Sequence, residues 1–195
     1  GELEKAVDYC HLHNVKIYQA VNTLVFDNEL SDFLKAAKLS AELGIDAFIV
    51  QDVGAAKMLK QALPDMKLNA STQMSIHTKE GALLAKESGF SRVVLSRELS
   101  FNTIKDIASA DIEVETFIHG ALCMSVSGQC YMSAMIGSRS ADRGLCAQAC
   151  RLPFSAIKGQ ERSDLSLKDL SGIDCIPELE KAGVTSIKIE GGMKR

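Results

Sequence analysis

Short apolar segments alternate with amphipathic segments along most of the chain, and this alternation constrains its fold more than any other feature. Continuous apolar runs are typical of strands in a parallel sheet, and the segments between them have the periodicity of helices. We therefore expect parallel βα units. The expected strands are 15–24, 47–50, 67–71, 92–95, 112–118, 165–168 and 186–189, and the expected helices are 2–13, 31–43, 54–63, 78–88, 100–108 and 176–182.

The number and spacing of these units favour a barrel. Strands that recur at roughly 20–30 residues fit an α/β fold of the (β/α)8 TIM-like type better than an open sheet. A doubly wound sheet is the alternative, although no glycine-rich dinucleotide turn follows any strand. We expect residues 1–195 to form a single partial barrel domain that lacks its first strand. Because the chain begins without methionine, we expect it to be a piece of a larger protein.

Polar residues follow the apolar strands at the points where the strands end. In a barrel of this kind the carboxyl ends of the strands meet at one mouth, where the working residues lie. Strand ends also meet water and are polar for that reason, but the recurrence from strand to strand favours a polar pocket. These residues are Asn22, Gln51, Asp52, Thr72, Gln73, Arg97, Glu98, Glu115, His119, Lys168, Asp169 and Glu190.

A cysteine-rich insertion at residues 119–160 interrupts the pattern after the sixth barrel strand, if the missing first strand is counted. Long insertions in compact domains are usually functional or disordered. No export signal opens the chain, so we expect reduced thiols rather than disulfides. Four thiolates suit a [4Fe–4S] cluster or zinc; the lack of tight C-x2-C pairs favours the cluster, and redox-active or inert thiols stay open. The spacing is C-x6-C-x15-C-x3-C, formed by Cys123, Cys130, Cys146 and Cys150.

Glu115 and His119 lie four residues apart at the start of the insertion, so both side chains fall on the same face of the expected strand. A carboxylate beside an imidazole can transfer protons or hold a metal. A structural hydrogen-bonded pair at the barrel mouth is the plainer alternative. We therefore consider both residues candidates for catalysis.

Charge and hydropathy limit the possible partners. The formal net charge of −3 provides no general attraction to nucleic acid, so any RNA-binding surface would have to be a local basic patch. No apolar run is long enough to span a bilayer. We expect a cytoplasmic protein without a membrane segment, and the sequence does not indicate an oligomeric state.

Several motifs resemble those of peptidase family U-32, the collagenase-like peptidases. The most specific is ETFIHGALCMSVSGQC at 115–130, and NTL at 22–24, RGLCAQACR at 143–151, SLKDL at 166–170 and KIEG at 188–191 also match. Among the branches of this family, the residues of these motifs are most similar to those of the branch that hydroxylates a ribosomal RNA cytidine. The resemblance covers essentially the whole chain and implies the N-terminal barrel of the family, with the remaining regions of the full-length protein as partners.

The resemblance implies an activity, a cofactor and site residues. It implies oxygen-independent hydroxylation of an RNA base, a 23S rRNA cytidine or a tRNA uridine, with a [4Fe–4S] cluster and prephenate as the hydroxyl donor. Collagenase-like proteolysis is the alternative that the family name states. The four cysteines of the insertion are implied as cluster ligands. Candidate catalytic residues are Glu115, His119, Lys168, Asp169 and Glu190, and candidate substrate-binding residues are Asn22, Gln73, Arg143, Arg151 and Lys188.

Two positions depart from the family pattern. Several relatives carry a cysteine where this chain has Ser171, so Cys150 is expected to be the fourth ligand here. Family members usually carry arginine where this chain has Gly192, and the loss of that cation is expected to weaken anion binding at the mouth.

Overall fold

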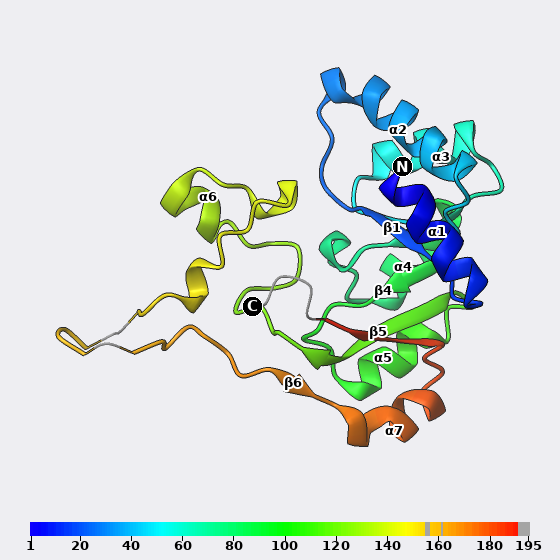
Figure 1. Cartoon of the computed structure of the whole chain (residues 1–195). Helices are drawn as coiled ribbons and strands as arrows, with labels where there is room; N and C mark the ends of the chain where they lie inside the picture. The colour runs from blue at the N-terminus through cyan, green and yellow to red at the C-terminus, as the bar shows by residue number, and fades with distance from the viewer. Residues whose placement is uncertain (155–156, 161, 191–195) are drawn as a thin grey trace.

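The computed structural model describes residues 1–154, 157–160 and 162–190, and Gly192 lies outside these residues. Within them, six strands form a parallel sheet in the order β1-β2-β3-β4-β5-β7. Helices alternate with these strands, so the chain forms a parallel α/β half-barrel (Figure 1). The strands are β1 Tyr18–Val21, β2 Ala47–Val50, β3 Lys67–Ala70, β4 Arg92–Val94, β5 Glu113–Gly120, β6 Leu170–Ser171 and β7 Ser186–Ile189.

The expected strand at 165–168 is wrong. Those residues form a turn and irregular backbone, and the short strand β6 follows them and pairs antiparallel with the end of β5. Arg151 explains the difference, because its guanidinium binds the hydroxyl of Ser166 and the carbonyl of Leu167. This segment is therefore attached to the insertion instead of the sheet. Consequently β7 pairs directly with β5, and the parallel sheet has one strand fewer than expected.

Three of the helices begin at capping residues that sequence rules favour, whereas α2, Leu30–Glu42, begins after Glu29 and has no side-chain cap. The side chains of Asp52, Thr78 and Ser100 each accept a backbone N–H in the first turn of the helix that follows. No helix in the described part of the chain is long and apolar enough to cross a membrane. The helices are α1 Glu2–Leu12, α2 Leu30–Glu42, α3 Val53–Ala62, α4 Lys79–Glu87, α5 Phe101–Ala108, α6 Met132–Gly137 and α7 Ile176–Lys181.

The two faces of the sheet differ in polarity. On one face, side chains such as Phe48, Leu68 and Val114 are buried in the main hydrophobic core. Because neighbouring residues of a strand point to opposite faces, Asn69 and Glu115 lie on the other face, where both are also buried. The sheet therefore places buried polar groups on the inner side of the half-barrel.

The cysteine-rich insertion leaves the end of β5 and stands apart from the helices that pack on the sheet. Figure 1 shows α6 and the loops around it on the left, with the long connection to β6 below them. Inside the insertion α6 packs on the 3-10 turn Ala149–Arg151, and the buried residues there include Ser133 and Ala149. The insertion is thus a small unit beside the barrel.

The end of β5 comes very close to the chain that follows β7. A Cβ atom on Gly120 would lie 1.9 Å from the carbonyl oxygen of Glu190, and Gly120 has a φ of +108°. Both observations require glycine, because no side chain fits and L-residues rarely adopt this backbone conformation. Gly120 therefore permits the contact that brings Glu190 to the mouth.

We predict that Gly120→Ala destabilises the protein by about 3 kcal/mol or more, through the steric clash and the positive φ. Gly137→Ala is the matched control, because a Cβ there meets nothing within 4 Å, and it should change stability by less than about 1 kcal/mol. Urea-induced unfolding followed by circular dichroism measures both changes. Equal stability of the two variants would contradict the proposed close approach.

Candidate functional site

Glu115 lies at the centre of a charged network on the inner face of the sheet. Its Oε2 accepts hydrogen bonds from Arg92 Nη1 at 3.0 Å and from Ser186 Oγ at 2.9 Å, and Lys188 Nζ lies 3.5 Å from its Oε1. Burial opposes the charge on Arg92, but Glu113 and Glu115 together raise the pKa of its guanidinium above the ordinary value. The structure therefore brings two candidate residues, Glu115 and Lys188, into contact.

This arrangement indicates that Glu115 positions neighbouring side chains. It does not favour a role for Glu115 as a free general base. Both carboxylate oxygens already have cationic or hydroxyl partners, and the side chain is buried. A buried carboxylate needs such partners, because its unpaired charge would be very costly. Lys188 is partly exposed, so its ammonium group is held by Glu115 while it stays accessible to an anionic ligand.

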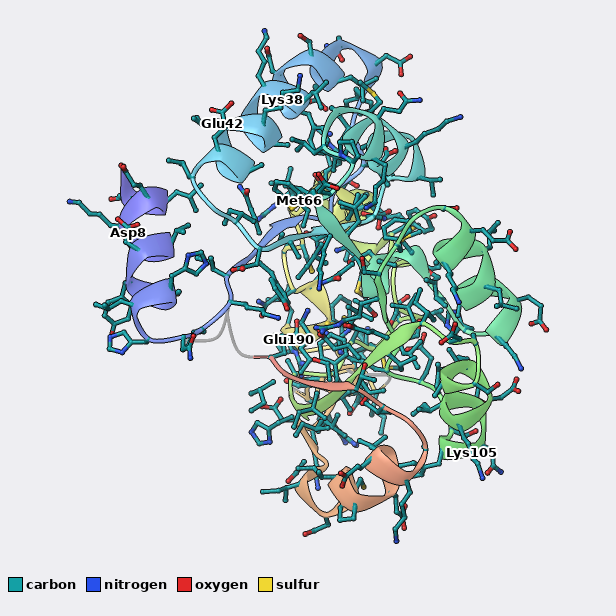
Figure 2. The ribbon with its side chains drawn as sticks, turned by 90° about the vertical axis from the view of Figure 1, so that its right-hand side faces the viewer. Asp8, Lys38, Glu42, Met66, Lys105 and Glu190 are labelled. Atoms are coloured by element: carbon teal, nitrogen blue, oxygen red, sulfur yellow. The ribbon has the colours of Figure 1, made fainter. Side chains whose placement is uncertain are left out.

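Arg97 joins the ends of β4, β5 and β7. Its guanidinium forms an ion pair with Glu190 and lies over the Phe117 ring, 3.8 Å from the centroid. Lys188 Nζ lies 5.5 Å from the same ring. Figure 2 labels Glu190 near the middle of the molecule, whereas Lys38 and Glu42 on α2 and Lys105 on α5 point outward. Two cations and one carboxylate therefore meet at the mouth around one aromatic ring.

Three of the four insertion cysteines share this neighbourhood. Burial raises the pKa of the Cys123 thiol, Arg97 lowers it in part, and Glu190, Cys146 and Cys150 raise it further. These effects place Cys123 within electrostatic range of the other two thiols and of the Arg97–Glu190 pair. No three His, Cys, Asp or Glu side chains are gathered as a ligand set among the described residues.

The exposed Cys146 sulfur has two hydrogen-bond donors within 4 Å. The backbone N–H of Gln148 lies 3.4 Å from this sulfur, and the hydroxyl of Ser133 lies 3.9 Å from it. Hydrogen bonds to sulfur stabilise thiolates and tune the potential of bound iron–sulfur clusters. Soft thiolate donors and N–H···S contacts are compatible with a metal or cluster at this loop, which stays a prediction.

Arg143 and Arg151 attach the insertion to the rest of the chain. Arg143 forms a bidentate pair with Glu29, with two N···O distances of 2.7 Å, and its guanidinium stacks over Phe26. Arg151 binds the carbonyl of Leu122 at 2.9 Å as well as the 166–167 segment. Both side chains are thus occupied by protein contacts in this structure, and their binding of substrate stays a prediction.

The remaining candidates are more scattered. His119, Lys168 and Asp169 are exposed near the junction of β5 and β6. Asn22 donates a hydrogen bond to Ser71 Oγ at 3.4 Å, and the side-chain oxygen of Gln73 is buried without a hydrogen-bond partner among the described residues. Two surface cavities, of about 390 and 500 Å³, lie beside the amino ends of strands, so the polar pocket at the mouth also stays a prediction.

One group missed by the sequence analysis is Asp142, a residue of the insertion. Its backbone carbonyl accepts the N–H of Leu24 at 3.1 Å, and Gln51, which follows β2, influences its carboxyl group. Burial raises the pKa of the Asp142 carboxyl above its ordinary value, although Gln51 lowers it in part. Desolvated carboxyl groups of this kind often mark functional sites. Only the fold reveals it, because Gln51 lies 91 positions earlier in the sequence.

The sequence model described as Peptidase family U32 matches residues 1–195. The chain belongs to this family. It is 40% identical over 200 residues to the 23S rRNA 5-hydroxycytidine C2501 synthase of Escherichia coli, covering 99% of this chain and 30% of that protein. It is 32% identical to tRNA hydroxylation protein P1 of Bacillus subtilis, covering 99% of this chain and 49% of that protein.

The solved structure of the U32 peptidase Mk0906 has the same fold. The TM-score is 0.65 at 14% identity, and the match covers 97% of this chain and 76% of that one. These findings confirm the family and the barrel-like α/β fold that the sequence motifs implied. The chain spans at most about half the length of the two curated U32 relatives, so their activities concern larger proteins.

We predict that Asp142→Asn stabilises the protein at pH 7.5. A carboxyl group whose folded-state pKa is raised contributes most to stability at low pH, and this contribution is lost as pH rises through the folded pKa. The uncharged amide has nearly the same shape as the carboxyl group and avoids the cost of a buried charge. The gain should shrink as pH falls toward about 3.9, the ordinary pKa of aspartate.

Thermal unfolding at pH 7.5 and 4.5 measures this difference. Asp111→Asn is the control, because Lys86 lowers the pKa of Asp111 and its loss should not stabilise the protein at any pH. A gain for Asp142→Asn that stays constant with pH would contradict the burial of its charged form.

Proposed function

We propose that this chain is the barrel part of an enzyme that hydroxylates an RNA base without molecular oxygen, in the cytoplasm where rRNA and tRNA are found. The observation that carries the proposal is the four-cysteine insertion, which leaves the end of β5 where Arg97 and Glu190 form an ion pair. Its relatives include proteins named as an rRNA hydroxycytidine synthase and as a tRNA hydroxylation protein. An rRNA cytidine is the first choice of substrate because that relative shares the higher identity.

The four cysteines would hold a [4Fe–4S] cluster. When bound, it would supply one-electron transfer, which zinc cannot do, and zinc is therefore the less suitable occupant. Transfer of a hydroxyl group from an organic donor to a base carbon oxidises the base by two electrons and reduces the donor by two. A donor of the prephenate type carries carboxylates, and the cations at the mouth suit such a molecule.

The residues of the mouth would bind and orient the reactants. Lys188, held by Glu115, and Arg97, held by Glu190, present positive charge beside Phe117. Guanidinium and ammonium groups bind carboxylates and phosphates through charge-assisted hydrogen bonds. Glu190 is partly exposed and could be displaced from Arg97 by a ligand carboxylate. His119, at the end of β5, and Asp142 are candidates for proton transfer.

The charge of the insertion favours RNA as the larger substrate. Residues 119–160 contain four Lys or Arg and a single acidic residue, in a chain whose net charge is −3. The exposed Tyr131 is suitable for stacking on a base, and exposed Arg139 for contact with phosphate. The other two arginines of the insertion are engaged by protein groups, so Arg139 and Lys158 are the exposed cations of the insertion that we propose for contact with RNA.

The peptidase alternative is less well supported. A cysteine nucleophile needs a lowered thiol pKa and a neighbouring base, whereas burial raises the pKa of Cys123. The His119 side chain is exposed, and no hydrogen bond joins it to Cys123 among the described residues. Absence of gelatin hydrolysis by the purified protein would remove this alternative.

We predict that replacing any one of the four insertion cysteines by serine lowers the iron content of anaerobically purified protein at least about twofold, because a cubane cluster needs four ligands. Cys10→Ser is the matched control, since Cys10 lies on α1 outside the insertion, and it should keep the wild-type iron content. Iron and sulfide analysis with visible absorption measures this. Wild-type protein without iron would refute the cluster.

We also predict that deletion of the gene removes one hydroxylated nucleoside from cellular RNA. The full-length protein should restore it, and Lys188→Ala in that protein should not, because the cation beside Glu115 is lost. Nucleoside mass spectrometry of rRNA and tRNA measures the outcome. An unchanged nucleoside profile in the deletion strain would contradict RNA hydroxylation.

A further inference from the structure

The segment between Cys123 and Cys130 is held at its middle residue. Ser127 is 3% exposed and is the buried residue of this segment, whereas Met124 and Val126 beside it are about half exposed. The segment therefore has almost no apolar anchor. Its position over the mouth depends on the polar contacts of Ser127 and its neighbours.

Glu98, which follows β4, makes the first of these contacts. Its Oε1 accepts the Ser127 backbone N–H at 2.8 Å, and its Oε2 accepts the Ser127 hydroxyl at 2.9 Å. Burial opposes ionisation, but hydrogen bonds from Ser127 and His77 hold the pKa of the Glu98 carboxyl below its ordinary value. Glu98 thus binds Ser127 through both carboxylate oxygens.

The turn after β3 makes the second contact. Ser75 Oγ donates to the Ser127 carbonyl at 2.6 Å, and Gln129 Nε2 donates to Ser75 Oγ at 3.1 Å. His77 connects the two anchors, because its Nδ1 lies 2.6 Å from the Ser75 carbonyl and its Nε2 lies 3.0 Å from Glu98 Oε1. The His77 ring therefore lies between the two residues that hold Ser127.

Close packing of the backbone completes this contact. A Cβ on Gly128 would lie 2.2 Å from the carbonyl oxygen of Gln73, and Gly128 has a φ of +77°. The loop thus rests directly on the turn that contains Gln73, with no room for a side chain between them. Glu98, after β4, therefore binds the N–H of Ser127, and Ser75, after β3, binds its C=O.

We propose that Ser75, His77 and Glu98 are positioning residues that hold Cys123 and Cys130 in place for cluster binding. Ser127 lies four residues after the first cysteine and three before the second, so fixing it restricts the reach of both thiols. This inference rests on the proposed function, because the cysteines are ligands only if the cluster binds. We call Ser75, His77, Glu98 and Ser127 the Ser127 clasp.

Glu98→Gln tests the clasp. The amide cannot accept all the bonds that the carboxylate accepts, so the loop should open about tenfold more often, as expected for loss of hydrogen bonds to a charged group. In anaerobic full-length protein, the half-life of the bound cluster in the presence of an iron chelator should fall by a similar factor. The melting temperature should stay near that of the wild type, since the barrel core is unchanged. Ser127→Ala, which keeps the backbone bonds, should show a smaller effect.

Asp46→Asn is the matched control. The Asp46 carboxylate also accepts bonds from a histidine ring, that of His11 at 3.0 Å, and from a backbone N–H, that of Ile17 at 2.8 Å. It lies at the amino end of β2, away from the insertion. Its substitution should leave the half-life of the cluster unchanged. Glu98→Gln with a wild-type half-life, or an equal loss in the control, would overturn the proposal.

A second measurement, proteolysis of the iron-free protein, tests the Ser127 clasp independently of cluster binding. In iron-free protein, chymotrypsin should cut at Leu122, Met124 or Tyr131 about tenfold faster in Glu98→Gln than in the wild type, if opening precedes cleavage. If the wild type binds no iron but this difference appears, the cluster is refuted and the clasp stands. If cleavage is equal in both proteins, the clasp is refuted, whatever the iron content.

Discussion

The buried charge of Glu115 on β5 is the constraint around which the inner face of the half-barrel is arranged. Parallel strands bury one face under helices, and on the other face Glu115 must be paired because an isolated buried carboxylate is very costly. Arg92, Ser186 and Lys188 supply the partners from β4 and β7. The same pairing holds Lys188 at the mouth, so one electrostatic requirement serves both stability and the proposed binding of an anion.

Hydrogen bonds and ion pairs, more than apolar packing, attach the insertion to this frame. Arg143 binds Glu29, Arg151 binds two backbone segments, and Glu98 binds Ser127, while Met135 and Ile136 on α6 stay exposed. Directional contacts of this kind fix the loop at defined points and leave the segments between them free to adjust. Such an attachment is compatible with the proposed binding of a cluster and of a large substrate by this loop.

The fold was largely predictable from the sequence, and the wrong prediction of a strand at 165–168 has a definite physical cause. The capping side chains and the apolar runs located most helices and strands, because helix caps and burial act over a few residues. At 165–168 the predicted strand was wrong, because the guanidinium of Arg151 binds this segment and holds it at the insertion. A local sequence pattern does not show that Arg151 will form a hydrogen bond with Ser166, fifteen residues further along the chain.

The sequence by itself determined the family, the parallel α/β fold and the four-cysteine motif, since these depend on residue types and spacings that can be read along the chain. Only the tertiary structure showed that Arg97 pairs with Glu190, that the Asp142 carbonyl binds the N–H of Leu24, and that Glu98 and Ser75 hold Ser127. These contacts join residues brought together by strand pairing and by the return of the insertion. Their chemistry depends on distance, burial and charge in space, which the order of residues along the chain does not contain.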